Sequence, residues 1–315
     1  MPHLTGGGRR GTRCAPGPAG VAGAGAGAWG ELRIGVPGYA HPLLAVAEWT
    51  ALTRPGTPLD WVGLTVANGP GDRPDPDCLA AAGRLVNAGV RVLGRLDLAH
   101  GSRPVGELAA EAERYARWYR VGGFLLDRCP ADRDGLAAVR RTTAALRVVA
   151  GTVGCVVGTG PGVRSGGGRA RGGAPHLVLG LDGHPHPGYA EIADQLVTFC
   201  GSWADYRWSQ VAQWTADHPP GRFAHFVHGV PRTHLEEAAR IARWQGAGTV
   251  FFTDRRAAGP AGRPAGCTAG RTAGRPAGGD GPVGEAYPDG HSGAFKSLPG
   301  YWDDFVSQIG PGVSE

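Results

Sequence analysis

Asp127 ends a short apolar stretch, 122–127, whose sequence is GGFLLD. Such a stretch is typical of a buried strand that carries a carboxylate to the rim of a sheet. A carboxylate at a rim could act as an acid or a nucleophile in the hydrolysis of a glycosidic bond, which needs two carboxyl groups. The next residue is Arg128, and a guanidinium close to Asp127 would favour the ionised carboxylate over the protonated acid.

Other apolar stretches also end in polar or nucleophilic residues. These residues are Asn68, Asp97, Asp182, Cys200, His228 and Asp254. Several acids around one rim suit a ligand rich in hydroxyl groups. A strand-end aspartate also serves as the N-cap of the helix that follows, so both roles stay open for each one.

Two further patterns point to cofactors or metals less strongly. The sequence VVGTGPG at 156–162 resembles a dinucleotide motif, but it runs into a Gly/Arg tract where such a motif must open a helix. His184, His186, His225 and His228 could chelate zinc, although exposed loop histidines are the simpler interpretation. The six cysteines have no CxxC or zinc-ligand spacing. We therefore expect free, buried thiols, no metal and no cofactor.

The order of elements that must position these residues is an alternation of strands and helices. Apolar runs of strand length lie at 32–36, 60–67, 90–97, 122–127, 176–181, 195–200, 222–230 and 248–254. Helical periodicity occupies 43–53, 76–88, 104–119, 133–147, 203–217 and 232–245. Eight strands that alternate with helices predict the α/β class and a (β/α)8 TIM-type barrel. A doubly wound open sheet is the alternative, because a miscount of one or two strands would change the architecture.

Glycine and proline are unevenly distributed along the 315 residues, which include 56 Gly and 26 Pro. Tracts rich in Gly, Pro and Arg cannot bury enough apolar area to offset the entropy of ordering. We therefore predict a disordered N-terminal tract at 1–30, one barrel domain at 31–308, and low-complexity insertions at about 150–175 and 257–290.

The same tracts account for the net charge of +5, since 1–30, 163–175 and 257–286 hold nine arginines and two acids. The predicted barrel is not basic, so we expect no nucleic-acid partner. No run of 18 apolar residues is present, so we expect no membrane partner. Without an apolar signal-peptide core the chain as written is expected in the cytoplasm. It would be secreted or at the cell surface if its true N-terminus lies elsewhere.

Six segments, taken in order, resemble spherulin-4-like proteins (spherulation-specific family 4). They are VPGYAHP (36–42), TVANGPGD (65–72), VLGRLDLAHG (92–101), YARWYRVGGFLLD (115–127), HPGYAEIADQLVTFCGSWADY (186–206) and LPGYWDDFV (298–306). The family's proteins are (β/α)8 barrels that include retaining glycoside hydrolases of galactosamine-containing polysaccharides. The resemblance implies a similar barrel with a carbohydrate site.

Two positions depart from the family pattern, which has Asp-Glu after the fourth strand and Phe-Glu after the sixth. This chain has Asp127-Arg128 and Phe199-Cys200, so one acid is retained and both glutamates are replaced. One carboxylate cannot serve both as nucleophile and as acid. Cys200 could replace a carboxylate as nucleophile only with a stabilised thiolate, and its strand-end position predicts an apolar setting instead.

We therefore expect a catalytically degenerate relative of a polysaccharide hydrolase that still binds an amino-sugar polysaccharide. The expected ligand-binding residues around Asp127 are Tyr39, His41, Asn68, Asp97, Asp182, Tyr189, Trp203 and Asp254. Trp203 could stack on a sugar ring or pack on the barrel. Two alternatives stay open: an active glycosidase that pairs Asp127 with another rim aspartate, and a non-enzymatic interaction scaffold.

Overall fold

The computed structural model describes residues 31–38, 40–153, 174–181, 183–257 and 292–310. The predicted tract at 1–30 and most of the two predicted insertions lie outside these residues, so their disorder stays a prediction. No helix in the described ranges has both the length and the apolarity that a membrane span requires.

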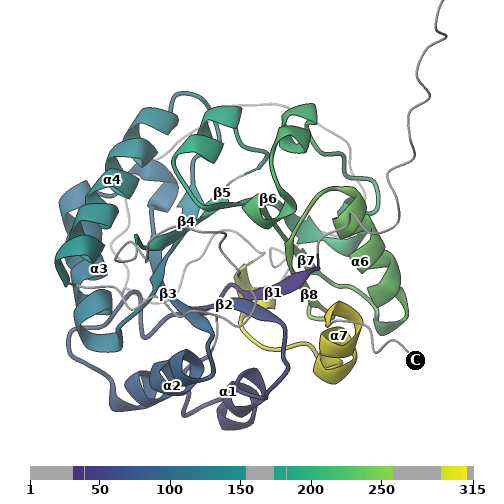
Figure 1. The fold of residues 1–315 in the computed structure, drawn as a ribbon, viewed down its shortest axis with the longest axis horizontal. Coiled ribbons are helices and arrows are strands. Elements are labelled where there is room, and N and C mark those ends of the chain that lie inside the picture. The colour runs from purple at the N-terminus through teal and green to yellow at the C-terminus, as the bar shows by residue number, and fades with distance from the viewer. Residues whose placement is uncertain (1–30, 39, 154–173, 182, 258–291, 311–315) are drawn as a thin grey trace, which may run out of the picture.

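Eight parallel strands pair in chain order and close into a barrel, with β1 beside β8 (Figure 1). The strands are β1 (Arg33–Val36), β2 (Leu59–Leu64), β3 (Arg91–Asp97), β4 (Gly123–Cys129), β5 (His176–Leu181), β6 (Gln195–Ser202), β7 (Phe223–His228) and β8 (Thr249–Thr253). Each of them overlaps one of the predicted apolar runs. The prediction of a (β/α)8 barrel is confirmed, and the open-sheet alternative is wrong.

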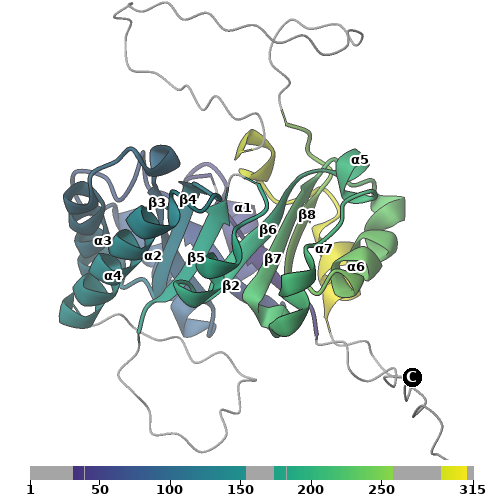
Figure 2. The same cartoon turned by 90° about the horizontal axis from the view of Figure 1, so that it is seen from above.

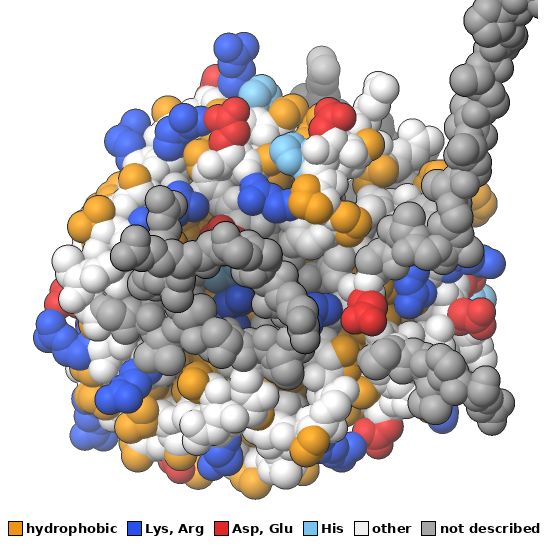
Figure 3. All heavy atoms as spheres, in the orientation of Figure 1, with side chains coloured by type: hydrophobic (Ala, Val, Ile, Leu, Met, Phe, Trp, Pro, Cys, Tyr) orange, Lys and Arg blue, Asp and Glu red, His pale blue; other side chains and the backbone are white. Residues whose placement is uncertain are grey.

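Helices surround the barrel and cover the outer faces of the strands (Figures 1 and 2). They are α1 (Val46–Leu52), α2 (Pro76–Asn87), α3 (Val105–Tyr119), α4 (Leu136–Val153), α5 (Trp203–Tyr206), α6 (Leu235–Trp244) and α7 (Trp302–Ile309). Their buried faces carry small and apolar residues at helical spacing, as in α3 with Leu108, Ala112 and Tyr115. On the face seen in Figure 3, basic and acidic side chains of the described residues are interspersed rather than gathered by sign.

The predicted helix at 203–217 is wrong over most of its length. The helix α5 ends at Tyr206, and the chain is irregular until the short 3-10 helix η3 (Gln213–Asp217). A tertiary contact overrides the helical period here, because the side-chain amide of Gln245 donates to both the carbonyl and the hydroxyl of Ser209, at 3.0 and 2.9 Å.

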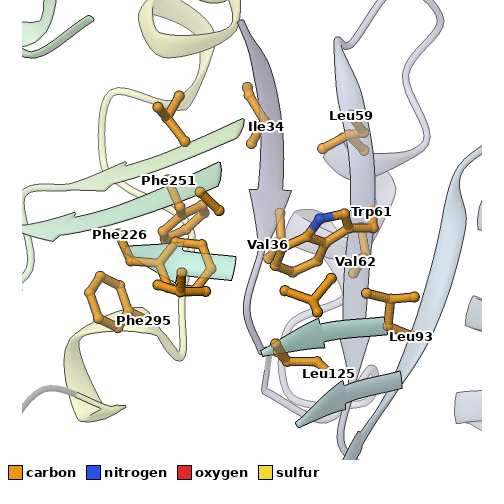
Figure 4. Close-up of a cluster of buried hydrophobic side chains, with 14 of the residues drawn as sticks. Ile34, Val36, Leu59, Trp61, Val62, Leu93, Leu125, Phe226, Phe251 and Phe295 are labelled. Atoms are coloured by element: carbon orange, nitrogen blue, oxygen red, sulfur yellow. The ribbon is translucent and has the colours of Figure 1, made fainter. Parts of the chain in front are cut away.

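The barrel interior is filled by side chains. Trp61 on β2 reaches across to β6, where its indole N–H donates to Gln195 Oε1 at 2.8 Å, and both side chains are buried. Gly35 makes room for this indole, since a Cβ there would lie 2.6 Å from the Trp61 ring. Figure 4 shows Trp61 among Val36, Val62 and Leu93. The packed interior confines any ligand to one of the barrel's two ends.

Candidate functional site

Asp97 and Asp127 lie side by side where β3 and β4 end, because these two residues are in register in the parallel ladder. The carboxyl ends of the strands are where barrels of this type place their chemistry. Both carboxylates are about three-tenths exposed, with side-chain exposures of 30% for Asp97 and 27% for Asp127. Solvent and a ligand can therefore reach both groups.

Two arginines bind these carboxylates, and each ion pair joins β3 to β4. Arg95 on β3 donates from Nε to Asp127 Oδ2 at 3.1 Å, and its Nη2 contacts the same oxygen. Arg128 on β4 donates from Nε to Asp97 Oδ1 at 2.8 Å and from Nη2 to Oδ2, which is a bidentate pair. We call these four residues the rim quartet.

The rim quartet shows which cation binds each carboxylate. Arg128 follows Asp127 in the chain, but its guanidinium binds Asp97, and the cation on Asp127 is Arg95. Consecutive residues of a regular strand point to opposite faces. The ladder between β4 and β5 is irregular between Leu126 and Cys129, and Arg128 has a left-handed φ of 50°. This local bulge lets both Asp127 and Arg128 point to the barrel mouth.

The electrostatics of Asp97 follow from opposing effects. Burial raises the pKa of its carboxyl, but hydrogen bonds from Arg128 and from the Ala99 backbone, and the charges of Arg128 and Arg95, outweigh burial and leave the pKa below its usual value. A further arginine, Arg103, holds the Asp97 carbonyl at 3.1 Å and pairs with Glu111 at 2.6 Å. Asp97 is therefore held as a carboxylate.

A hollow of about 410 Å³ lies on the loops that follow β3, β4 and β5. Its lining residues are His100, Pro130, Ala131, Asp132 and His184. His100 comes three residues after Asp97, and Pro130 comes two residues after Arg128, so the hollow adjoins the rim quartet. Sequence reasoning missed His100 and Asp132, because only the fold brings these loops together. It considered His184 only as a turn residue or zinc ligand.

Cys200 is also at the mouth end of its strand, in register with Phe226 on β7. The residue is exposed, so the expected buried thiol in an apolar setting is wrong for Cys200. The strand β5 separates β6 from β4, so Cys200 is two strands away from Asp127. The other described cysteines, Cys78 and Cys129, are buried, as expected.

The remaining expected site residues separate into rim and packing residues. His41 lies at 3.3 Å from Asp75, and Asn68 is exposed in the turn after β2. Tyr189 is fully buried, and its hydroxyl donates to the Asp132 carbonyl at 3.0 Å. Burial raises the pKa of Tyr189 to about 12.

Trp203 and Asp254 have structural contacts. Trp203 is 8% exposed and packs against Tyr206 and His234, which favours the packing interpretation over sugar stacking. Asp254 accepts a hydrogen bond from the Gly300 backbone at 3.2 Å. Tyr39 and Asp182 lie outside the described residues, so their expected roles stay predictions.

The histidines expected on exposed loops lie in two different settings. His184 is exposed, but His225 and His228 lie within β7 and are buried, which corrects the expectation for these two. His225 accepts or donates hydrogen bonds at both ring nitrogens, to the Tyr206 hydroxyl at 2.8 Å and the Thr198 hydroxyl at 3.1 Å. Both are therefore part of the packed barrel wall.

Comparison with known proteins supplies the context for this rim. The profile of Spherulin4, described as spherulation-specific family 4, matches residues 33–260. Among solved structures, that of Aspergillus clavatus Sph3 in complex with GalNAc superposes with a TM-score of 0.62 at 19% identity. The match covers 89% of this chain and 98% of Sph3, and it supports the barrel fold.

A second solved structure, described as a variant of BT1044SeMet, matches with a TM-score of 0.37 at 12% identity, over 71% of this chain and 81% of that one. That likeness is too low to support an inference. No curated protein matches the chain.

Proposed function

Because the chain belongs to spherulation-specific family 4 over residues 33–260, we propose that it is a carbohydrate-binding barrel that has lost the hydrolysis of glycosidic bonds. The proposed ligand is a polysaccharide that contains galactosamine or its N-acetyl form. The family resemblance supports this choice of sugar, and so does the GalNAc bound to the similarly folded Sph3.

The rim quartet is the observation that best supports the proposed loss of hydrolysis. Cleavage needs one carboxyl that donates a proton and a second that attacks the sugar or activates water. The pKa of Asp97 lies below its usual value, so this carboxylate is unsuited to donate a proton at neutral pH. Asp127 is bound by Arg95, and the two family glutamates are replaced by Arg128 and Cys200.

The same arrangement suits binding. Charged donors and acceptors at a half-open rim can hydrogen-bond sugar hydroxyl and acetamido groups. The adjoining hollow adds the polar side chains of His100, Asp132 and His184, with Pro130 and Ala131 as apolar contacts. A site with a few convergent polar groups beside apolar surface is typical of small-molecule recognition.

The test combines calorimetry with an assay for released reducing ends, using galactosamine-containing oligosaccharides. We expect wild-type binding without cleavage. The Asp127→Ala variant should bind about 10-fold or more weakly, because a hydrogen bond to a charged group contributes about 1.5–3 kcal/mol. The exposed Asp217 belongs neither to the rim quartet nor to the residues that line the hollow, and Asp217→Ala is the matched control.

Two results would contradict the proposal. Equal affinity of wild type and Asp127→Ala would remove Asp127 from the binding site. Cleavage by the wild type that disappears in Asp127→Asn would establish an active glycosidase instead, with Asp97 as the first candidate for its second carboxylate.

A further inference from the structure

A group of three potential metal ligands lies outside the rim quartet, between the loop after β1 and the start of α2. His41 belongs to the loop, Asp75 is the N-cap of α2, and Cys78 lies in its first turn. The helices α1 and α2 are neighbours in the ring (Figure 1). Sequence spacing did not reveal the group, because His41 is 34 residues away from Asp75.

The donor atoms are close enough to surround one ion. His41 Nε2, a carboxylate oxygen of Asp75 and Cys78 Sγ all lie within 4.8 Å of one another. His41 Nε2 is 3.3 Å from Asp75 Oδ2. Zinc bonds of about 2.0–2.1 Å to nitrogen and about 2.0–2.2 Å to oxygen place two such ligands about 3.3 Å apart at a tetrahedral ion.

Capping of α2 explains only part of this arrangement. The backbone N–H of Cys78 donates to Asp75 Oδ1 at 2.8 Å, which satisfies the start of the helix. The other oxygen, Oδ2, faces the imidazole that arrives from a different loop. A metal at Oδ2 would therefore leave the cap intact.

The group combines a buried thiol with an open approach. Cys78 is fully buried, whereas the side chains of His41 and Asp75 are 23% and 28% exposed. Burial, and then the negative charge of Asp75, raise the pKa of the Cys78 thiol to about 12, and the charge of Asp77 acts in the same direction. These negative charges would attract a divalent cation. The positive charge of the bound cation would in turn favour the thiolate form of Cys78.

We propose that His41, Asp75 and Cys78 form a zinc site with three protein ligands and a fourth position for water. Nitrogen, oxygen and sulfur donors together match the preferences of zinc. On binding, the Cys78 thiol gives up its proton to solvent and the thiolate sulfur moves onto the ion. Asp75 binds as the carboxylate it already is, so one proton is released for each ion bound.

His41 sets a further requirement. Its Nδ1 accepts a hydrogen bond from the Leu43 backbone at 3.3 Å, so the neutral imidazole carries its proton on Nε2, toward Asp75. Zinc at Nε2 needs that proton to move to Nδ1, and the Leu43 contact must then break. The ion would replace this local contact by a link between the β1 loop and α2, at the end of the barrel that also carries the rim quartet.

The test uses the full-length reduced protein and cobalt(II) as a spectroscopic probe. We expect the charge-transfer absorption of a cobalt–thiolate bond and the visible bands of a tetrahedral ion. The Cys78→Ser variant should lose the charge-transfer absorption. The Cys129→Ser variant, which removes another buried thiol, should keep it.

Zinc calorimetry in two buffers of different ionisation enthalpy measures affinity and proton release. Loss of an outer partner of a metal ligand already lowers affinity about 10–100-fold. We therefore expect a loss of at least about 100-fold in His41→Gln and in Asp75→Ser, where serine preserves the helix cap. Retention of the cobalt–thiolate absorption in Cys78→Ser, or no such absorption in the folded wild type, would overturn the proposal. Neither readout depends on sugar binding.

Discussion

The rim quartet shows that the role of a charged residue depends on the residue with which it pairs. Asp127 and Arg128 are adjacent in the chain, yet each binds a residue of β3 rather than the other. The sequence could predict that both residues reach a strand end. It could not predict the pairing, because the pairing depends on the bulge and the left-handed φ at Arg128.

The first prediction concerns restoring the family's glutamate at this position. Arg128→Glu would place a carboxylate beside Asp97 and leave Asp97 without its bidentate partner. Breaking a partly buried pair in this way should lower the free energy of unfolding by about 1–3 kcal/mol, since both desolvation and like charge act against the variant. Urea unfolding of the wild type and the variant measures this difference.

Asp97→Asn in the Arg128→Glu background is the companion variant. Removing the second negative charge should recover part of the lost stability, and non-additivity of the two changes would reveal their contact. Additive effects would show that Arg128 and Asp97 are not coupled in solution.

A second prediction concerns hydrolysis. The double variant Arg128→Glu, Cys200→Glu restores the two family acids, and we expect it to release a small but measurable amount of reducing ends where the wild type releases none. The rate should be far below that of an evolved enzyme, because a misplacement of about 1 Å can cost about 10²-fold. Adding Asp97→Asn should raise the rate further, because it removes the negative charge that would repel the introduced carboxylate. No activity in either variant would count against the two replacements as the cause of inactivity.

At the scale of elements, α3 fixes the position of β3 and hence of Arg95. Tyr115 of α3 is fully buried and packs directly over Gly94, the residue before Arg95. A Cβ at residue 94 would lie 2.6 Å from the Tyr115 ring. This close approach requires glycine.

We therefore expect Gly94→Ala to destabilise the barrel by about 1–3 kcal/mol through overpacking. The matched control is Gly83→Ala, which adds the same methyl group to an exposed position of α2 with nothing within 4 Å. It should stabilise the protein by about 0.5–1 kcal/mol, because alanine favours helix. Thermal unfolding of both variants gives the comparison, and equal effects would contradict the packing of α3 on β3.

The elements also show where sequence reasoning works and where it fails. The eight strands were predictable because buried parallel strands are apolar throughout. The helix predicted over 203–217 is wrong over most of its length. Its aromatic residues repeat with a helical period, but Gln245 holds Ser209 in an irregular turn. His41, Asp75 and Cys78 were not predicted as a group for the same reason: a contact between loops leaves no local signal.

At the scale of the whole molecule, two histidines of the barrel wall link stability to pH: His225, which is buried, and His176, which is half-buried. Burial lowers the pKa of His225 to about 3, and burial together with the charge of Arg91 lowers the pKa of His176 to about 4. In the unfolded chain both would titrate near pH 6.5. The unfolded state therefore binds protons more readily below pH 6.5. The contribution of each histidine to stability is complete above that pH and is lost as the pH falls toward about 4 for His176 and about 3 for His225.

Each histidine should reduce the free energy of unfolding by about 1.4 kcal/mol per pH unit below its unfolded pKa. Urea midpoints between pH 7 and 4.5 test this slope. His225→Gln should be less stable at pH 7. Its free energy of unfolding should change less steeply with pH, by about the amount that the uptake of one proton contributes. An unchanged slope in His225→Gln would contradict the assignment of a neutral buried imidazole.

The ion pair between Arg128 and Asp97 also limits the order in which substitutions can have accumulated in this barrel. Arg128 stands where the family pattern has glutamate. A glutamate at position 128 would repel Asp97, whereas Arg128 without Asp97 would lack its partner. Positions 97 and 128 should therefore have changed together, or with a neutral residue at 97 as the intermediate. Among homologues, an acid at 97 should accompany a base at 128, and reconstructed ancestors should show either both changes in one step or a neutral residue at 97 before the charge at 128 changes sign.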